Sequence, residues 1–231
     1  MVLRIRGTRL GIVGGLGTET SCGFCLSLNT RLRRITNCQP NIVMENVPVP
    51  ISLETSIIKG DPDRAMFDLL ARAVTNLNDA SSDLIVIPCN TVHVFIDELR
   101  SVSKKPILSI IEECAKECSD SGFRKVGLLA TSTTVKQALH HKELAKKNIE
   151  VVLPKNQSFV SEVILRILGN TTKISDKIFL LSCINELKLF GAEAVILGCT
   201  DLDLLISEEE SSLPLIDTTK VLEDVLVKLL S

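Results

Sequence analysis

One short pattern occurs twice in this chain and constrains its fold more than any other feature. Residues 83–91 read DLIVIPCNT and residues 193–201 read EAVILGCTD, so an acidic residue, an apolar run, a cysteine and a threonine follow in the same order. Each apolar run is long enough for a buried strand and too short for a helix. The chain therefore contains two similar strands, and each ends at a cysteine.

Two further segments repeat in the same order. Residues 9–13 resemble residues 125–129, and residues 106–108 resemble residues 214–216. Short apolar strands resemble each other by chance, but three matches in order, with a cysteine in the same place, indicate an internal duplication. We infer two similar α/β lobes.

Apolar strand patterns alternate with helical patterns along the whole chain, which predicts parallel sheets covered by helices. The predicted fold class is α/β, with two Rossmann-like lobes related by a pseudo-twofold axis and an active site in the cleft between them. We expect residues 1–105 together with 214–231 to form the first lobe, and residues 106–213 to form the second. The helices are expected at residues 19–34, 61–78, 92–102, 110–119, 135–147, 158–168, 175–190 and 218–230.

Composition excludes several classes of function. The chain has 231 residues, 45% of them hydrophobic, with a net charge of −2 and neither Trp nor Tyr. Without a basic block or aromatic surface, we expect no nucleic-acid partner. No apolar run approaches the length of a membrane span, and the first one is too short for a signal peptide. We expect a cytoplasmic protein with no membrane partner.

Eight cysteines need an interpretation that fits this compartment, where disulfides are rare. Two pairs have the spacing of zinc or redox sites, but a zinc site would require both pairs to converge. The six cysteines other than Cys89 and Cys199, both pairs included, are interpreted as small buried hydrophobic residues, and no metal is expected. This group comprises Cys22, Cys25, Cys38, Cys114, Cys118 and Cys183.

A glycine turn follows the first predicted strand, at residues 15–18. The dinucleotide-binding pattern would require a third glycine at Thr20 and an acidic residue about twenty positions later, and both are missing. We therefore expect no nucleotide, although the glycines allow backbone amides to approach a small anion closely.

The two repeated cysteines suit a two-base proton exchange. The C-terminal ends of strands in open α/β sheets are where ligands bind, so Cys89 and Cys199 would face each other across the cleft. One would remove a proton as thiolate and the other would supply one as thiol. Helix N-termini after each cysteine are expected to lower the thiol pKa. Asn90, Thr91 and Thr200 could hold a carboxylate that takes on enolate character.

Four motifs resemble the aspartate/glutamate racemase family, in particular its cofactor-independent aspartate racemases, over essentially the whole chain. They are GIVGGLG at residues 11–17, PCNTVH at 88–93, LLATSTT at 128–134 and GCTD at 198–201. The resemblance implies the two-lobe fold, often a homodimer, and catalysis without pyridoxal phosphate, metal or nucleotide. It implies Cys89 and Cys199 as catalytic residues. It implies a substrate-binding set of Leu16, Ser52, Asn90, Thr91, Thr131, Ser132 and Thr200.

The chain departs from this family where an acidic substrate would be recognised. Ser52 stands near the position of an arginine that grips the side-chain carboxylate in aspartate-specific relatives, and Ile167 stands near a second basic position. Lys59 or Arg64 could substitute. Losing a bidentate arginine removes a strong carboxylate contact, so racemase chemistry is better supported than an acidic substrate.

Histidines and alternative functions complete the predictions. His93, one helical turn after Cys89, could tune a thiolate, whereas His140 and His141 are interpreted as solvated.

A hydantoin racemase or a maleate isomerase is the alternative among enzymes. Decarboxylases of malonate-type acids keep one cysteine and fit less well. A non-catalytic amino-acid-binding protein with this fold is the alternative outside catalysis.

Overall fold

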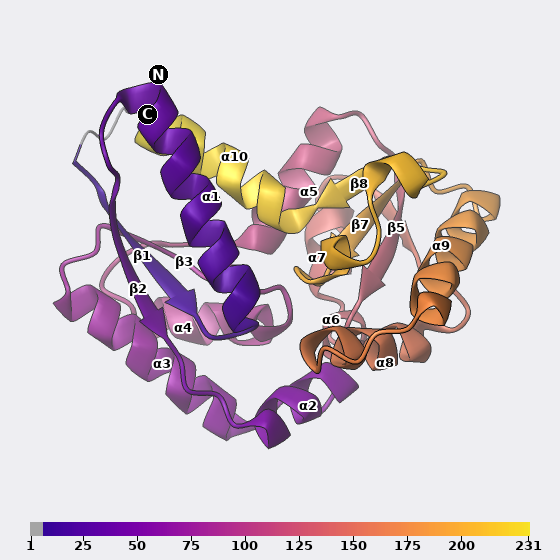
Figure 1. Ribbon diagram of the computed structural model, residues 1–231, viewed down its shortest axis with the longest axis horizontal. Coiled ribbons are helices and arrows are strands. Elements are labelled where there is room, and N and C mark those ends of the chain that lie inside the picture. The colour runs from indigo at the N-terminus through magenta and orange to yellow at the C-terminus, as the bar shows by residue number, and fades with distance from the viewer. Residues whose placement is uncertain (1–6) are drawn as a thin grey trace.

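The computed structural model describes residues 7–231, so the first six residues of the predicted first lobe lie outside the described part. Two four-stranded sheets form the frame, and all neighbouring strands in each are parallel (Figure 1). The first has the order β2-β1-β3-β4 and the second β6-β5-β7-β8. The strands are β1 (Arg9–Gly14), β2 (Asn41–Asn46), β3 (Leu84–Val86), β4 (Ile107–Leu108), β5 (Lys125–Ala130), β6 (Glu150–Val152), β7 (Ala194–Gly198) and β8 (Leu215–Asp217).

The two sheets have the same topology, which confirms the predicted pair of similar α/β lobes. Strand for strand, β1 corresponds to β5, β3 to β7 and β4 to β8, as the sequence repeat indicated. Every residue of β7 is buried, because helices cover both faces of its sheet, and this is why the strand is a continuous apolar run.

Helices pack on both sheets, and polar N-caps set where several of them begin. Asp63 and Asp217 accept hydrogen bonds from backbone N–H groups in the first turns that follow them. Within residues 7–231, no helix is both long and apolar enough to cross a membrane. The α-helices are α1 (Thr18–Thr36), α2 (Ile51–Lys59), α3 (Arg64–Asp79), α4 (Ile96–Val102), α5 (Ile110–Asp120), α6 (Ser132–Lys136), α7 (Leu139–Ala145), α8 (Gln157–Leu168), α9 (Ile174–Leu189) and α10 (Thr218–Leu230). Three 3-10 helices are η1 (Thr91–Phe95), η2 (Leu202–Leu204) and η3 (Glu208–Glu210).

The chain crosses between the lobes twice, through α5 and α10. β4 pairs with β3 in the first sheet, and α5 then leads to the second. β8 pairs with β7 in the second sheet, and α10 returns to pack on α1, beside which it lies in Figure 1. Both repeated proline strands thus belong to the sheet that precedes the crossing, whereas the expected domain division placed each of them after it. The predicted return of the C-terminal segment to the first lobe concerns α10 alone.

The return of α10 is held by apolar and charged contacts. Leu222 and Leu226 of α10 share a buried core with Phe24 and Leu28 of α1. Arg31 of α1 pairs with Glu223, with Nη1 and Oε2 3.0 Å apart, and also with Asp224. Burial of the apolar side chains, together with these two ion pairs, ties α10 to α1.

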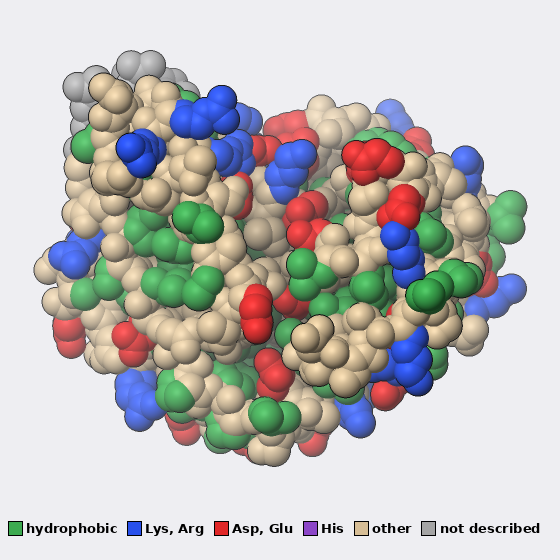
Figure 2. Space-filling view, viewed as in Figure 1, with side chains coloured by type: hydrophobic (Ala, Val, Ile, Leu, Met, Phe, Trp, Pro, Cys, Tyr) green, Lys and Arg blue, Asp and Glu red, His purple; other side chains and the backbone are tan. Residues whose placement is uncertain are grey.

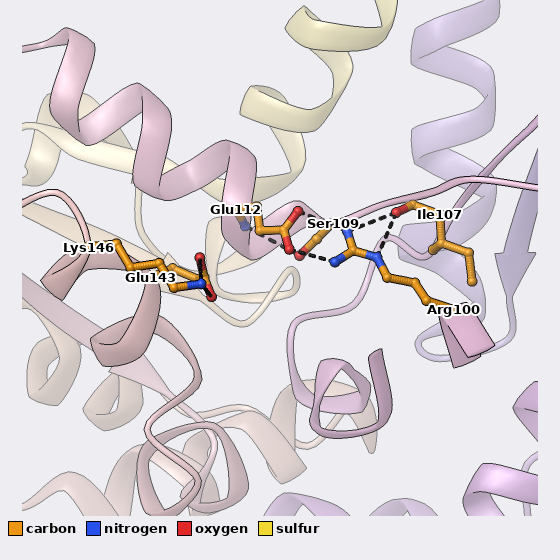
Figure 3. A network of polar contacts seen from close by, with 6 residues as sticks. All are labelled: Arg100, Ile107, Ser109, Glu112, Glu143 and Lys146. Carbon is orange, nitrogen blue, oxygen red and sulfur yellow. Dashed lines mark hydrogen bonds and ion pairs between the residues drawn. The ribbon is translucent and has the colours of Figure 1, made fainter. Parts of the chain in front are cut away.

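A polar network fixes the first crossing at its origin (Figure 3). Arg100 at the end of α4 donates to both carboxylate oxygens of Glu112, over 2.6 and 2.8 Å, and to the Ile107 carbonyl. Ser109 caps α5 by accepting from the Glu112 backbone N–H. The bidentate pair holds the start of α5 against the first lobe.

Two helical segments differ from expectation. Residues 51–59 form α2, where no helix was expected. Pro50 sits at the N-cap, which a helix tolerates because the helical hydrogen bonds need no backbone N–H at that position and proline has none. The helix expected up to residue 147 is divided into α6 and α7, because Ala138 adopts a left-handed conformation with φ 54°. Helix α2 packs against α6 and α8, so it links the lobes.

The cysteines outside the repeated pattern divide into a buried and an exposed group, with the half-buried Cys25 between them. Cys114, Cys118 and Cys183 are buried, as interpreted from the sequence. Cys22 and Cys38 are exposed, so their interpretation as buried residues is wrong. Among residues 7–231, no group of three or more His, Cys, Asp or Glu side chains is arranged to hold a metal ion.

Candidate active site

A pocket lies where the C-terminal ends of β1, β3, β5 and β7 meet, and it takes walls from both lobes. It encloses about 460 Å³ of space free of protein atoms, open solvent at its mouth included. Cys89 and Cys199, which follow β3 and β7, both line it. The structure thus brings the two repeated cysteines to one pocket.

Both thiols are hard to ionise in this environment. Burial, helped by the carboxylates of Asp201 and Glu54 and opposed by the backbone N–H groups of Val92 and Thr91, raises the pKa of Cys89 to about 11. Burial also raises the pKa of Cys199 well above its usual value, with Asp201 again adding to it. The expected lowering by helix N-termini is wrong in net direction, because only short 3-10 helices follow the cysteines and burial outweighs their N–H groups.

Three predicted substrate-binding residues connect the lobes at the pocket. Asn90 donates from Nδ2 to Thr218 Oγ1 over 2.9 Å, and its Oδ1 lies 3.0 Å from His140 Nε2. The hydroxyls of Thr91 and Thr131 are 3.0 Å apart. The side chain of Asn90 is 1% exposed and both ends of its amide have partners within the protein, which leaves it little capacity for a substrate.

The remaining predicted residues divide between the pocket wall and other places. Leu16 and Thr200 line the pocket, and Thr200 is 5% exposed. Ser132 does not line it; its N–H and hydroxyl lie 2.8 and 2.9 Å from the Ser161 hydroxyl. Ser52 is exposed on the outer face of α2 and is not part of the wall.

Two carboxylates that were not predicted as site residues line the pocket instead. Asp201 accepts a hydrogen bond from Thr20, and its Oδ2 lies 3.5 Å from the Cys199 sulfur. Glu54, on α2, also lines the pocket. Burial, helped by the negative charge of Glu19, raises the pKa of Asp201. On the face shown in Figure 2, acidic side chains lie along the middle of the molecule, between the two halves.

The glycine turn serves this arrangement. Gly17 has φ +81°, which favours glycine, and a Cβ there would stand 3.1 Å from Oδ1 of Asp201. The close approach that the glycines allow is therefore made by a carboxylate of the protein itself. The signal for Asp201 was present in the sequence, because it is the last residue of the second cysteine motif at residues 198–201.

No Lys or Arg lines the pocket among the described residues. Arg64, a candidate substitute for the missing arginine, pairs with Glu98 and lies over the Phe67 ring. Lys59 is exposed and outside the wall. Arg166 donates to both carboxylate oxygens of Asp176, over 2.9 and 2.8 Å, so it is engaged away from the pocket.

Two histidines are buried behind the pocket. His93 holds the carbonyl of Cys89 with Nδ1, over 2.7 Å, and burial lowers its pKa to about 4. His140 is 0% exposed, and burial lowers its pKa to about 3. The interpretation of His140 as solvated is wrong: its side chain is buried, whereas Lys142 on the same helix is exposed.

The family of Asp/Glu/Hydantoin racemases matches residues 13–224, which include both cysteine motifs. The chain belongs to this family. The resemblance to the aspartate/glutamate racemase family that the four sequence motifs indicated is therefore confirmed.

Similar proteins agree with this assignment. The broad specificity amino-acid racemase RacX of Bacillus subtilis (strain 168) is 24% identical over 218 residues, covering 92% of this racemase-family chain and 94% of RacX. The aspartate racemase of Picrophilus torridus has a similar structure, with a TM-score of 0.81 and 26% identity, covering 96% of this chain and 94% of that one. A glutamate racemase from Francisella tularensis subsp. tularensis SCHU S4, in complex with D-glutamate, has the same fold, with a TM-score of 0.68, 21% identity and coverage of 97% and 83%.

Proposed function

We propose that this protein is a cofactor-independent amino-acid racemase that inverts Cα by two-base proton transfer between Cys89 and Cys199. The observation that carries the proposal is that equivalent strand ends of two duplicated lobes deliver one thiol each to a single pocket. Family membership supports racemisation as the reaction class. The pocket's other polar groups support a small amphoteric ligand.

The proton balance of the reaction needs both cysteines. One thiolate takes the Cα proton and becomes a thiol, the C–H electron pair moves into the substrate as an enolate, and the other thiol donates its proton to the opposite face and becomes the thiolate. The two cysteines exchange roles at each turnover. General acid and base groups matched in this way lower the barrier in both directions.

Because the pKa values of both thiols are raised, both cysteines are protonated near neutral pH, and one of them must lose its proton before the reaction can begin. Asp201 and Glu54 disfavour a thiolate on Cys89 as long as the pocket holds no compensating positive charge. The α-ammonium group of an amino acid would supply that charge on binding. Backbone N–H groups of Thr91 and Val92 already face the Cys89 sulfur, and the Thr200 hydroxyl lies in the wall where a carboxylate could bind.

Proton exchange in deuterated water tests the proposal. The protein is incubated with a panel of L-amino acids, and loss of the Cα proton by NMR is compared with inversion by chiral chromatography. We expect exchange with inversion for at least one amino acid, and a loss of at least about a hundredfold in Cys89→Ser and in Cys199→Ser. Cys22→Ser is the matched control, because Cys22 is an exposed cysteine of α1. Retained exchange in both site variants would contradict the two-base mechanism.

A further inference from the structure

The charge of the pocket wall is the starting observation. Its charged side chains are Glu54 and Asp201, and no basic side chain lines it among the described residues. The rest is largely apolar, with Ile57, Ile58 and Met66 on one side and Leu168 on another. Such a wall is unfavourable for a substrate whose side chain carries a carboxylate.

Glu54 differs from Asp201 in having no partner. Thr20 and Cys199 both contact the Asp201 carboxylate. The carboxylate of Glu54 has neither a hydrogen bond nor an ion pair within the described chain, and burial together with the charges of Asp201 and Glu19 raises its pKa. A partly buried carboxylate beside two others gains the most from a positively charged ligand.

Glu54 also stands at the exit of the pocket. Beside the cysteine pocket lies an open groove, and Gly17, Val49, Glu54 and Leu168 line both. The groove is also lined by Glu19 and by polar backbone of the glycine turn. A substrate with its Cα between the cysteines could therefore extend an apolar stem along Leu168 and present its end to Glu54.

We propose that the substrate of this racemase is an amino acid with a cationic side chain, an ammonium or guanidinium group, and that Glu54 determines this specificity. The inference rests on the proposed racemase function and names its substrate class. Compared with aspartate-specific relatives, the site for the substrate side chain has then lost a positive charge, the arginine near Ser52, and has a negative charge, Glu54. In this arrangement Asp201, whose Oδ2 lies 3.5 Å from the Cys199 sulfur, is the partner of the α-ammonium group.

A comparison of matched substrates tests this proposal. Rates of Cα proton exchange are measured for L-lysine, L-ornithine and L-arginine, for L-norleucine as an uncharged match to lysine, and for L-aspartate and L-glutamate. We expect kcat/KM for lysine to exceed that for norleucine and for glutamate by at least about tenfold. A wild-type preference for the acidic amino acids would overturn the proposal.

Variants of Glu54 separate this role from others. In Glu54→Gln we expect the lysine advantage over norleucine to fall by roughly tenfold, while norleucine changes by less than about twofold. Glu54→Asp should retain part of the advantage, and Glu162→Gln, an exposed carboxylate of α8 outside the pocket wall, should retain all of it. Equal losses on every substrate would mean that Glu54 binds the α-ammonium group, and a change in stability alone would mean that it supports the first turn of α2; either result would overturn the proposal.

Failure of the proposed function can be told apart from failure of this inference. If no amino acid exchanges its Cα proton, the racemase proposal fails. Calorimetric binding of L-lysine and L-norleucine to the wild type and to Glu54→Gln then still tests charge selectivity. Tighter binding of lysine that is lost in Glu54→Gln supports the cation subsite, and equal binding of the two ligands contradicts it.

Discussion

Nε2 of His140 donates a hydrogen bond to Oδ1 of Asn90 over 3.0 Å, between the second lobe and the loop that carries Cys89. The direction follows from the other end of the amide, because Nδ2 of Asn90 donates to Thr218, whose own hydroxyl proton goes to the carbonyl of Leu197. A neutral imidazole protonated on Nε2 thus positions the first cysteine loop against the second sheet.

Replacing His140 should weaken both stability and catalysis. His140→Phe leaves the Oδ1 atom of Asn90 buried without a donor, which costs about 1–3 kcal/mol of unfolding free energy. We expect kcat to fall about tenfold with little change in KM, because Cys89 would be misplaced relative to the bound substrate. His140→Gln, which can offer an amide donor, should recover part of kcat. Lys142→Gln, an exposed position on the same helix, is the control, and an unchanged kcat in His140→Phe would contradict a positioning role.

The buried histidines should make the protein sensitive to mild acid. Burial lowers the pKa of His140 to about 3 and that of His93 to about 4, whereas both titrate near 6.5 when unfolded. Below about pH 6.5 the unfolded state therefore binds protons that the folded state does not, and stability is lost as pH falls, by up to about 1.4 kcal/mol per unit for each histidine.

Urea unfolding at pH 7 and pH 5 measures this effect. Asp203 acts in the opposite direction, because burial raises its pKa to about 6 and the folded state then binds the extra proton. Comparison with His140→Gln cancels that contribution. The loss of stability between the two pH values should be smaller in the variant by up to about 2 kcal/mol. Equal losses in both proteins would show that His140 is not held neutral.

Thiol labelling should separate the exposed cysteines from the two in the pocket. Near neutral pH, iodoacetamide should modify Cys22 and Cys38 first, and Cys89 and Cys199 only slowly, because the latter two are held as thiols. Peptide mass spectrometry over time follows each site. Asp201→Asn removes a charge and a hydrogen bond that raise the pKa of Cys199, so labelling of Cys199 should become faster. Slower labelling in that variant would contradict this account of the electrostatics.

Arg166 should prove to be structural. Its bidentate pair with the buried Asp176 joins α8 to α9, so Arg166→Met should lower the unfolding free energy by about 2 kcal/mol. At a temperature where the variant is folded, KM for every substrate should match that of the wild type. A rise in KM confined to acidic amino acids would instead make Arg166 the cation that recognises a carboxylate.

The fold could be predicted largely because the chain repeats itself. The apolar runs within residues 83–91 and 193–201 form strands at equivalent positions of the two parallel sheets, and a cysteine follows the C-terminal end of each strand. The lobe boundaries depend on β4 and β8, which have two and three residues. Whether so short a strand adds to the sheet before it or begins the next lobe is decided by long-range pairing, which local pattern does not report.

The site was predictable where a residue acts alone and not where its neighbours decide its role. Cys89 and Cys199 follow from their motifs. Asn90 has the right chemistry for a carboxylate, yet its partners stand 50 and 128 positions away in the sequence and use both ends of its amide. Glu54 was not predicted, because no helix was expected at residues 51–59 and the side of the chain on which Glu54 lies could not be assigned.

The two crossings of the chain have a mechanical consequence. Because α5 and α10 pack against each other and both join the lobes, the lobes are connected at two places rather than by a single linker. Two paired connections resist twisting of one lobe relative to the other more than a single linker would, and they favour rotation about a line through the paired helices, which the packing of α2 on α6 and α8 opposes. A rotation of this kind would change the distance between the ends of β3 and β7, and therefore the separation of Cys89 and Cys199 in the pocket that they share.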